Sequence, residues 1–258
     1  MPRKSNKLNK TNESNKKFKK ITLMIPCYNE EASIGQLIDD IPVEKINKAG
    51  YKIEVLVIDN NSKDKTAEIA KAKGARVISE FNQGKGNAIR TGFNNIPKDV
   101  DYVVMLDGDN TYKPAEILRL IEPLESDFAD VILGSRLEGK MTTHAMSFSH
   151  RFANWVFTFL TRSLYQTSIT DTCTGYFAWT RKSVDILKNH IKSKGFAIEA
   201  EMISKMTRLK LRVYSVPITY APRPRDPNSK SKLNPFKDAL KIIWMLIKNR
   251  RWKPKKEE

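Results

Sequence analysis

The stretch Val103-Val104-Met105-Leu106-Asp107-Gly108-Asp109-Asn110 decides the fold, because an apolar run leads directly into two carboxylates one residue apart. Such a run, bounded by polar residues, predicts a strand buried in a parallel sheet. Ligands of open α/β sheets bind beyond the carboxyl ends of the strands, so Asp107 and Asp109 are candidate ligand-binding residues. Their mutual repulsion favours Mg²⁺ or Mn²⁺, held together with substrate phosphates. An acidic turn without a ligand is the alternative interpretation.

Apolar runs, polar loops and helical patterns alternate on both sides of this stretch. We expect strands at residues 21–25 (stopping at Pro26), 51–58, 75–78, 103–106 and 130–133, and helices at 33–41, 66–73, 88–94 and 114–124. The short connections favour an α/β fold, a mostly parallel doubly wound sheet with right-handed crossovers and flanking helices.

The second half of the chain departs from this alternation. A long aromatic helix is expected at residues 147–165 and a shorter amphipathic helix at 236–248. Either could pack on the sheet as core or lie in a membrane interface. Between them the sequence predicts a polar loop entering a strand (170–179), a helix carrying Glu199 and Glu201, a strand (212–220) and a basic, Pro-interrupted segment (223–233).

Length and charge suggest one domain with basic ends. The chain has 258 residues and a formal net charge of +17, and residues 1–20 alone carry eight Lys or Arg and one Glu. We expect a disordered tail at 1–19, inert or tethering the chain to a membrane, a catalytic domain at 20–235, and an amphipathic basic helix and tail at 236–258. Two distant cysteines indicate a reducing compartment, and the sequence shows no signal peptide or spanning apolar run. We therefore expect a cytoplasmic protein, with any peripheral membrane contact made by the two amphipathic helices and the basic ends.

Polar side chains follow the other predicted strands as well. Tyr28, Asn29 and Glu30 follow the first strand and could hold a nucleobase and ribose, or simply favour a helix start. Asp59 ends the second strand, where a carboxylate suits a base or ribose hydroxyl, although a nearby helix cap is the simpler alternative. Lys85 lies in a glycine-rich loop before a helix, a place where phosphate can approach closely.

Taken in order, these motifs resemble family 2 glycosyltransferases of the GT-A fold, most closely the dolichyl- and polyprenyl-phosphate sugar synthases. The resemblance covers about residues 20–245. It rests on Ile25-Pro26-Cys27-Tyr28-Asn29-Glu30-Glu31, Val57-Ile58-Asp59 with Ser62, Asp64 and Thr66, residues 82–87, Leu106-Asp107-Gly108-Asp109, Gly134-Ser135-Arg136, Asp171-Thr172-Cys173-Thr174-Gly175-Tyr176, and Ser231-Lys232-Leu233.

The resemblance implies an inverting, metal-dependent transfer from a nucleotide sugar to dolichyl or polyprenyl phosphate. It assigns the nucleoside to Pro26, Tyr28, Glu30 and Asp59, and the metal and diphosphate to Asp107 and Asp109. It assigns the acceptor or donor phosphates to Arg136, Arg151 and Lys232. It places Asp171 and Glu201 at the reaction centre, where with Asp109 and Arg136 they form the candidate catalytic set.

Two departures from the family pattern concern the donor. Asn60 stands where the family often has a second Asp, and Thr111 stands where mannosyl members often have Gln. They favour a UDP-sugar over GDP-mannose and leave the third metal ligand unassigned. Two other classes compete: a glycosyltransferase of the same fold with a non-lipid acceptor, and a nucleic-acid-binding protein suggested only by charge. The latter is disfavoured because no aromatic-basic RNA motif, zinc finger or helix-turn-helix is present.

Overall fold

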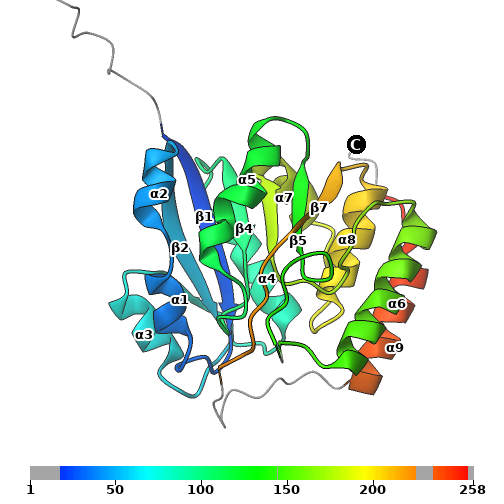
Figure 1. Cartoon of the computed structure of the whole chain (residues 1–258), viewed down its shortest axis with the longest axis horizontal. Helices are drawn as coiled ribbons and strands as arrows, with labels where there is room; N and C mark the ends of the chain where they lie inside the picture. The colour runs from blue at the N-terminus through cyan, green and yellow to red at the C-terminus, as the bar shows by residue number, and fades with distance from the viewer. Residues whose placement is uncertain (1–17, 144, 225–234, 255–258) are drawn as a thin grey trace, which may run out of the picture.

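The protein, represented by a computed structural model, is described at residues 18–143, 145–224 and 235–254. A seven-stranded sheet in the order β3-β2-β1-β4-β6-β5-β7 forms its centre (Figure 1). The strands are β1 (Lys19–Cys27), β2 (Tyr51–Asp59), β3 (Arg76–Ser79), β4 (Tyr102–Met105), β5 (Val131–Ser135), β6 (Phe177–Thr180) and β7 (Val213–Pro217). All neighbouring pairs are parallel except those of β6, which runs antiparallel to β4 and β5. The expected mostly parallel α/β sheet is therefore confirmed.

Helices cover both faces of the sheet. They are α1 (Ile34–Asp39), α2 (Val43–Lys48), α3 (Thr66–Ala72), α4 (Lys85–Asn94), a 3₁₀ turn (Pro114–Glu116), α5 (Ile117–Glu125), α6 (Phe148–Tyr165), α7 (Arg181–Lys188), α8 (Ile198–Arg208) and α9 (Pro235–Asn249). Two short helices, α2 and α7, were not expected from the sequence. Helix α4 begins at Lys85 and not at residue 88, so the lysine lies in its first turn.

The first strand continues through Pro26 to Cys27, and the expectation that it stops at the proline is wrong. The strand β4 pairs with β1 only over Ile21–Met24. Pro26 therefore has a neighbouring strand on one side only, at Ile58 of β2, and its missing N–H breaks no ladder on the other side. The extra residues bring Cys27 level with Asp59 at the carboxyl edge.

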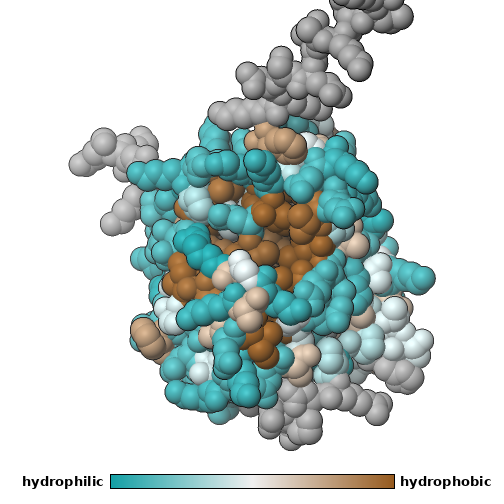
Figure 2. Space-filling model, turned by 90° about the vertical axis from the view of Figure 1, so that its left-hand side faces the viewer, coloured by the Kyte–Doolittle hydropathy of each residue, from teal (hydrophilic) through white to brown (hydrophobic). Residues whose placement is uncertain are grey.

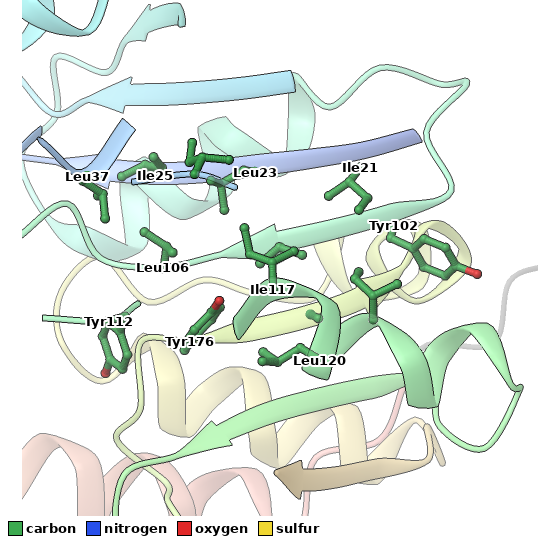
Figure 3. Close-up of a cluster of buried hydrophobic side chains, with 14 of the residues drawn as sticks. Ile21, Leu23, Ile25, Leu37, Tyr102, Leu106, Tyr112, Ile117, Leu120 and Tyr176 are labelled. Carbon is green, nitrogen blue, oxygen red and sulfur yellow. The ribbon is translucent and has the colours of Figure 1, made fainter. Parts of the chain in front are cut away.

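Alternate residues of β1 supply two hydrophobic cores, one on each face of the sheet. Ile21, Leu23 and Ile25 pack with helices α1 and α5 on one face (Figure 3). Met24 packs with α4 on the other face. A strand buried on both faces is mostly apolar, which explains the apolar runs of β1 and β4, and the buried hydroxyl of Thr22 in β1 donates to Glu54. Each fully buried Ile or Leu contributes about 1.5–3 kcal/mol.

The edge of the sheet formed by β2 and β3 is less covered. Figure 2 views the molecule from the side of α1–α3 and shows apolar residues in a hollow framed by hydrophilic ones. The strand β3 pairs only with Leu56–Asp59, so within the described chain the first half of β2 has no strand on its outer side. Tyr51, Ile53 and Val55 of that half are only partly buried.

Helices α6 and α9 form a separate layer at the opposite end of the sheet, where they lie side by side (Figure 1). Their facing residues, Phe157 and Tyr165 with Ile242 and Leu246, make a third apolar cluster. The hydroxyl of Tyr165 donates to the carbonyl of Leu246, which ties the two C-terminal ends together. Among the described residues, no helix has the length and apolar character needed to cross a membrane.

Candidate active site

Four carboxylates gather at the carboxyl ends of β1, β2 and β4. Burial, together with the negative charges of Glu30, Asp59, Asp107 and Asp109, raises the pKa of the Cys27 thiol well above its usual range. Gly108 lets this cluster close up, because a Cβ there would lie 2.5 Å from the sulfur of Cys27. The strand ends thus concentrate negative charge in one small region, as the position of the Asp-Gly-Asp turn suggested.

Lys85 is the main counter-charge of this region. Its ammonium lies 2.7 Å from Asp107 Oδ1 and 2.6 Å from Glu199 Oε1. Burial opposes the charge on Lys85, but the carboxylates of Asp107 and Glu199 outweigh that effect and raise its pKa above the ordinary value. Gly175 allows a further close approach, since a Cβ at this position would lie 2.2 Å from Asp107 Oδ2. Strand β4, helix α4, helix α8 and the 170–176 loop therefore meet at Asp107.

Asp109 lies beside this network and is held by its own turn. Its Oδ1 accepts hydrogen bonds from the hydroxyl of Thr111 at 2.6 Å and from the Thr111 N–H at 3.2 Å. Burial first, and then the charge of Asp107, raise the pKa of the Asp109 carboxyl. Arg223 forms an ion pair with Glu30, and its Nε lies 3.9 Å from Asp109 Oδ2. The chain after β7 therefore reaches across to the loop after β1.

The loops after β1 and β2 are joined by hydrogen bonds. Asn29 has a left-handed backbone (φ 53°); its N–H donates to Ser62 Oγ at 3.0 Å, and its side-chain oxygen accepts from Lys63 N at 2.9 Å. The Glu30 N–H donates to Thr66 Oγ1 at 2.7 Å. The positions of Asn29 and Glu30 are thus fixed by the β2–α3 loop.

The remaining residues expected at the nucleoside lie beside these loops. Pro26 is buried in β1, and Tyr28 is half-buried in the loop that follows. Asp59 is buried at the end of β2 and accepts one long hydrogen bond, 3.4 Å, from Ser62 N. Pro26, Tyr28, Glu30 and Asp59 therefore share one end of the β1–β2 pair.

The hydrogen bonds of Asn60 explain why this chain has Asn where the family often has a second Asp. Its side-chain oxygen accepts from the N–H of Gly84 at 2.6 Å, and its amide nitrogen donates to the carbonyls of Glu80 and Asn82. An aspartate could not donate to those two carbonyls. Asn60 therefore anchors the glycine-rich loop that leads to Lys85.

Glu201 holds the backbone of residues 192–193, which packs against the glycine-rich loop. Its partners differ from those of Asp107. Its Oε2 accepts from the N–H groups of Lys192 and Ser193 at 2.9 and 2.6 Å, and its Oε1 pairs with Lys205 at 2.6 Å. The backbone at residues 193–194 lies so close to Gly84 and Gly86 that a Cβ on either glycine would meet a carbonyl oxygen at 2.1 Å. Glu201, expected at the reaction centre, is placed in this supporting position.

Arg136 and Asp171 form a buried pair. The guanidinium donates to both oxygens of Asp171, at 2.8 and 2.9 Å, and the Arg136 N–H donates at 3.0 Å. Asn154 of α6 donates a fourth hydrogen bond at 2.8 Å, and Asp171 has no exposed surface. The ring of Tyr220 covers the guanidinium, with its centroid 5.3 Å away. Asp171 therefore holds Arg136 in place, and its carboxylate is fully occupied.

Two other residues were expected to bind phosphate. Arg151 is on the exposed surface of α6, and Lys232 lies outside the described residues. Sequence reasoning missed Glu199 and Arg223 as site residues. The signal for Glu199 was available: Glu201 has Lys205 four residues later, the spacing of a helical ion pair, which leaves Glu199 to face the sheet.

The arrangement suits a divalent cation with phosphate ligands. Within the described ranges no three His, Cys, Asp or Glu side chains are placed to share a metal ion. Mg²⁺ usually takes only one or two carboxylates and completes its shell with substrate phosphates and water. Burial first, and then the charge of Asp107, raise the pKa of Asp109, so a bound cation would stabilise its ionised form. Asp107 and Asp109 therefore fit a metal that arrives with a diphosphate.

Solved structures share this fold. Glucosyl-3-phosphoglycerate synthase of Mycobacterium tuberculosis, in a complex with Mn²⁺ and UDP, aligns with a TM-score of 0.66 at 20% identity, covering 92% of this chain and 82% of that one. Its complex with Mn²⁺, UDP-glucose and phosphoglyceric acid aligns at 0.67 and 20%, covering 92% and 81%. The fold is that of the GT-A glycosyltransferases.

Sequence comparison then gives the family. The profile of glycosyl transferase family 2 matches residues 22–187, and the chain belongs to this family of glycosyltransferases. A dolichyl-phosphate hexose transferase of Haloferax volcanii is 31% identical over 231 residues, which cover 90% of this chain and 94% of the relative. An undecaprenyl-phosphate mannosyltransferase of Micrococcus luteus is 29% identical, covering 79% and 84%. The chain is thus similar to polyprenyl-phosphate sugar synthases over most of its length.

Proposed function

We propose that this glycosyltransferase moves a sugar from a nucleotide sugar to dolichyl or polyprenyl phosphate, with inversion at the anomeric carbon. An acceptor phosphate oxygen bonds to that carbon while its bond to the diphosphate oxygen breaks, and the nucleoside diphosphate leaves. The observation that carries the proposal is the Asp107–Lys85–Glu199 network beside Asp109, at the carboxyl edge of the sheet. The names of the Haloferax and Micrococcus relatives support the lipid-phosphate acceptor.

Asp107 and Asp109 would hold Mg²⁺ or Mn²⁺. When bound, this ion supplies positive charge that stabilises the leaving diphosphate. Lys85 keeps its proton, because Asp107 and Glu199 raise its pKa, and so provides a second positive charge in the same region. Pro26, Tyr28, Asn29, Glu30 and Asp59 would hold the nucleoside at the adjoining strand ends. A UDP-sugar is favoured over GDP-mannose because Thr111 replaces the Gln of mannosyl members.

The acceptor chemistry agrees with the occupied carboxylates. A phosphate is already an anionic nucleophile, so the reaction needs no strong general base, only positioning and charge neutralisation. Asp171 and Glu201 are both saturated with hydrogen bonds and would act by holding other groups in place. Arg136 would face the acceptor from its fixed position, with Arg151 and Lys232 as further phosphate contacts.

The enzyme would work at the cytoplasmic face of a membrane, where its acceptor is embedded. Cys27 and Cys173 are both free thiols, in agreement with a reducing compartment. A glycosyltransferase with a soluble acceptor is the main alternative. Phosphoglyceric acid, present in complexes of a protein with the same fold, is the soluble phosphate to include in the assay.

The first test is thermal-shift binding of UDP- and GDP-sugars with and without Mn²⁺. A ligand that binds only the folded state raises the melting temperature by mass action. We expect a metal-dependent shift with a UDP-sugar, followed by transfer of its sugar to a short polyprenyl phosphate. Transfer to phosphoglyceric acid alone would favour the soluble acceptor. No shift with any donor, together with steeply salt-dependent binding to nucleic acid duplexes, would contradict the enzyme assignment.

A further inference from the structure

Helix α6 carries a stripe of large apolar residues that the protein does not cover. Phe148, Phe152, Trp155 and Phe159 recur at helical spacing and are 57–85% exposed. The ring of Trp155 stacks between those of Phe152 and Phe159, at centroid distances of 6.1 and 5.9 Å. Exposed apolar patches of this kind mark interaction surfaces.

Helix α9 carries a second stripe with the same spacing. Phe236, Leu240, Trp244 and Ile247 are 57–79% exposed. The two helices run side by side with their N-terminal ends at the same end of the layer (Figure 1). Ile242 and Leu246 of α9 bury the opposite face against α6. Both helices also pack on α8 with their buried sides, so the two exposed stripes lie on the side of the pair that faces away from α8. We name this surface the α6/α9 face.

The positive charges around the α6/α9 face indicate an anionic partner. Helix α6 contains no Asp or Glu, and it exposes Arg151 and Arg162. On α9, Lys237, Lys241 and Lys248 are exposed, and the single acidic residue, Asp238, is buried and paired with Lys241. A second copy of the chain would bring the same positive charges into contact. Aromatic side chains with flanking Lys and Arg match an anionic bilayer, apolar inside and negative at its surface.

The buried side of α6 leads to the active site. Asn154 donates to Asp171 at 2.8 Å and accepts from Cys173 N at 3.3 Å. Thr158 accepts from Thr172 N at 3.0 Å. The helix that exposes the aromatic stripe therefore also fixes the loop that holds Arg136.

We propose that the α6/α9 face docks on an anionic phospholipid bilayer, and that α6 sets the distance from the bilayer surface to the Asp171–Arg136 pair. The docking stands on the exposed residues and their charges. The second part rests on the proposed function, since only a lipid-linked acceptor needs such a fixed distance. The helices lie in the interface without spanning it, with Phe148 and Phe236 as the most exposed apolar contacts.

Docking is tested with the full-length protein and vesicles of phosphatidylcholine, with or without about 30% phosphatidylglycerol. We expect cosedimentation with the anionic vesicles and weak binding to the neutral ones. The double variant Trp155→Ser/Trp244→Ser removes one aromatic residue from each stripe. Its affinity for the anionic vesicles should fall by at least about tenfold. Phe128→Ser is the matched control, because Phe128 is 58% exposed, belongs to neither stripe and packs against Tyr214 of β7. It should bind as the unmodified protein does.

Quenching by brominated phospholipid gives a second readout on the native protein. Trp155 and Trp244 should be quenched on docking, whereas Trp179, which is fully buried, should not. Unchanged vesicle binding by the double variant would overturn the proposal. The proposal would also be overturned if the native protein did not bind vesicles but formed a dimer, while the double variant remained a monomer. That result would assign the face to a second copy of the chain.

Sugar transfer to a short polyprenyl phosphate in detergent separates this proposal from the proposed function. The double variant should keep full turnover in detergent, because neither tryptophan contacts the site, and lose turnover on vesicle-embedded acceptor. Stripe-dependent docking without use of any nucleotide sugar would refute the proposed function and leave the docking face intact. Equal turnover of variant and native protein on embedded acceptor would refute the role of α6.

Discussion

At the scale of single residues, the site is a balance of buried charges. Lys85 compensates Asp107 and Glu199, whereas Asp109 accepts hydrogen bonds from Thr111 and has the Nε of Arg223 at 3.9 Å. Asp109 is therefore the carboxylate with the most to gain from a metal ion, and the raised pKa of its side chain is the sign of that. A binding group left partly unpaired in the free protein is typical of functional sites.

We predict that Asp109→Asn lowers metal-dependent turnover about 100-fold or more, because one of two metal-binding carboxylates is lost. The melting temperature should stay the same or rise, since the substitution removes repulsion from Asp107. Turnover with saturating Mn²⁺ and a thermal melt check the two parts. Asp99→Asn, at an exposed residue paired with Lys20, is the control and should change neither. Full turnover by the Asp109 variant would contradict the metal assignment.

Arg136→Ala should destabilise the protein and not only weaken acceptor use. The change takes from the fully buried Asp171 two of its four hydrogen bonds, those of the guanidinium, and leaves the ones from the backbone N–H of residue 136 and from Asn154. Removing one partner of a buried pair costs about 3–5 kcal/mol. Urea unfolding measures this loss, and the double variant Arg136→Ala/Asp171→Asn should recover part of it. A single variant as stable as the native protein would mean that Arg136 is free to serve the acceptor alone.

Residue types at the strand ends could be read from the sequence, but their partners could not. The Asp-Gly-Asp turn after an apolar run placed Asp107 and Asp109 correctly at the carboxyl edge. Choosing between Glu199 and Glu201 requires knowing which face of α8 meets Lys85. The helical Glu201–Lys205 spacing held that information, and sequence reasoning did not use it.

At the scale of elements, the strands that could be predicted from the sequence are those with long apolar runs. The strand β4, most of β1 and the second half of β2 are buried on both faces and stand out as mainly apolar segments. Helices α2 and α7 were not predicted because they do not follow a strand and a polar loop: α2 follows α1 with no strand between them, and α7 begins at Arg181, directly after β6. The antiparallel direction of β6 also had no signal. It depends on residues 166–176, which return the chain from the end of α6 to the carboxyl edge, where Phe177 pairs with Met105.

Asp130 and Arg212 join β5 to β7 and make stability depend on pH. Arg212 donates to Asp130 through its N–H at 2.8 Å and through its guanidinium at 3.0 and 3.1 Å. These hydrogen bonds lower the pKa of Asp130 below its ordinary value. A carboxyl with a lowered folded-state pKa contributes stability above the unfolded-state value, near 3.9, and loses it as pH falls through the folded-state value.

We therefore predict that Asp130→Asn costs about 1 kcal/mol at neutral pH, a size typical of a partly exposed pair. The difference from the native protein should shrink as the pH falls below about 4, the unfolded-state value, and disappear once the pH lies below the folded-state pKa of Asp130. Urea unfolding at a series of pH values measures both curves. A gap that stays constant down to pH 3 would show that the Asp130 charge does not stabilise the folded state.

At the scale of the whole molecule, the last helix belongs to the core as well as to the surface. Ile242 and Leu246 are buried, the carbonyl of Leu246 accepts the hydroxyl of Tyr165, and Asn249 donates to Ser204 of α8 at 2.8 Å. The sequence predicted an amphipathic helix here but left open whether it packs on the body or on a membrane. One face of α9 packs on α6 and α8, and the other carries the exposed stripe of the proposed docking face.

Removing residues 236–258 should therefore destabilise the whole protein. The truncation exposes Phe157 and Tyr165 of α6 and takes away the buried side chains of α9, so we expect the free energy of unfolding to fall by about 4 kcal/mol or more. Removing only residues 255–258, which lie outside the described residues, is the control and should leave unfolding unchanged. Because α6 also holds Asp171, the longer truncation should lose activity in detergent as well as on vesicles, unlike Trp155→Ser/Trp244→Ser. A truncated protein with native stability would instead show that α9 is a detachable membrane anchor, and loss of transfer on vesicles alone would then be its only expected defect.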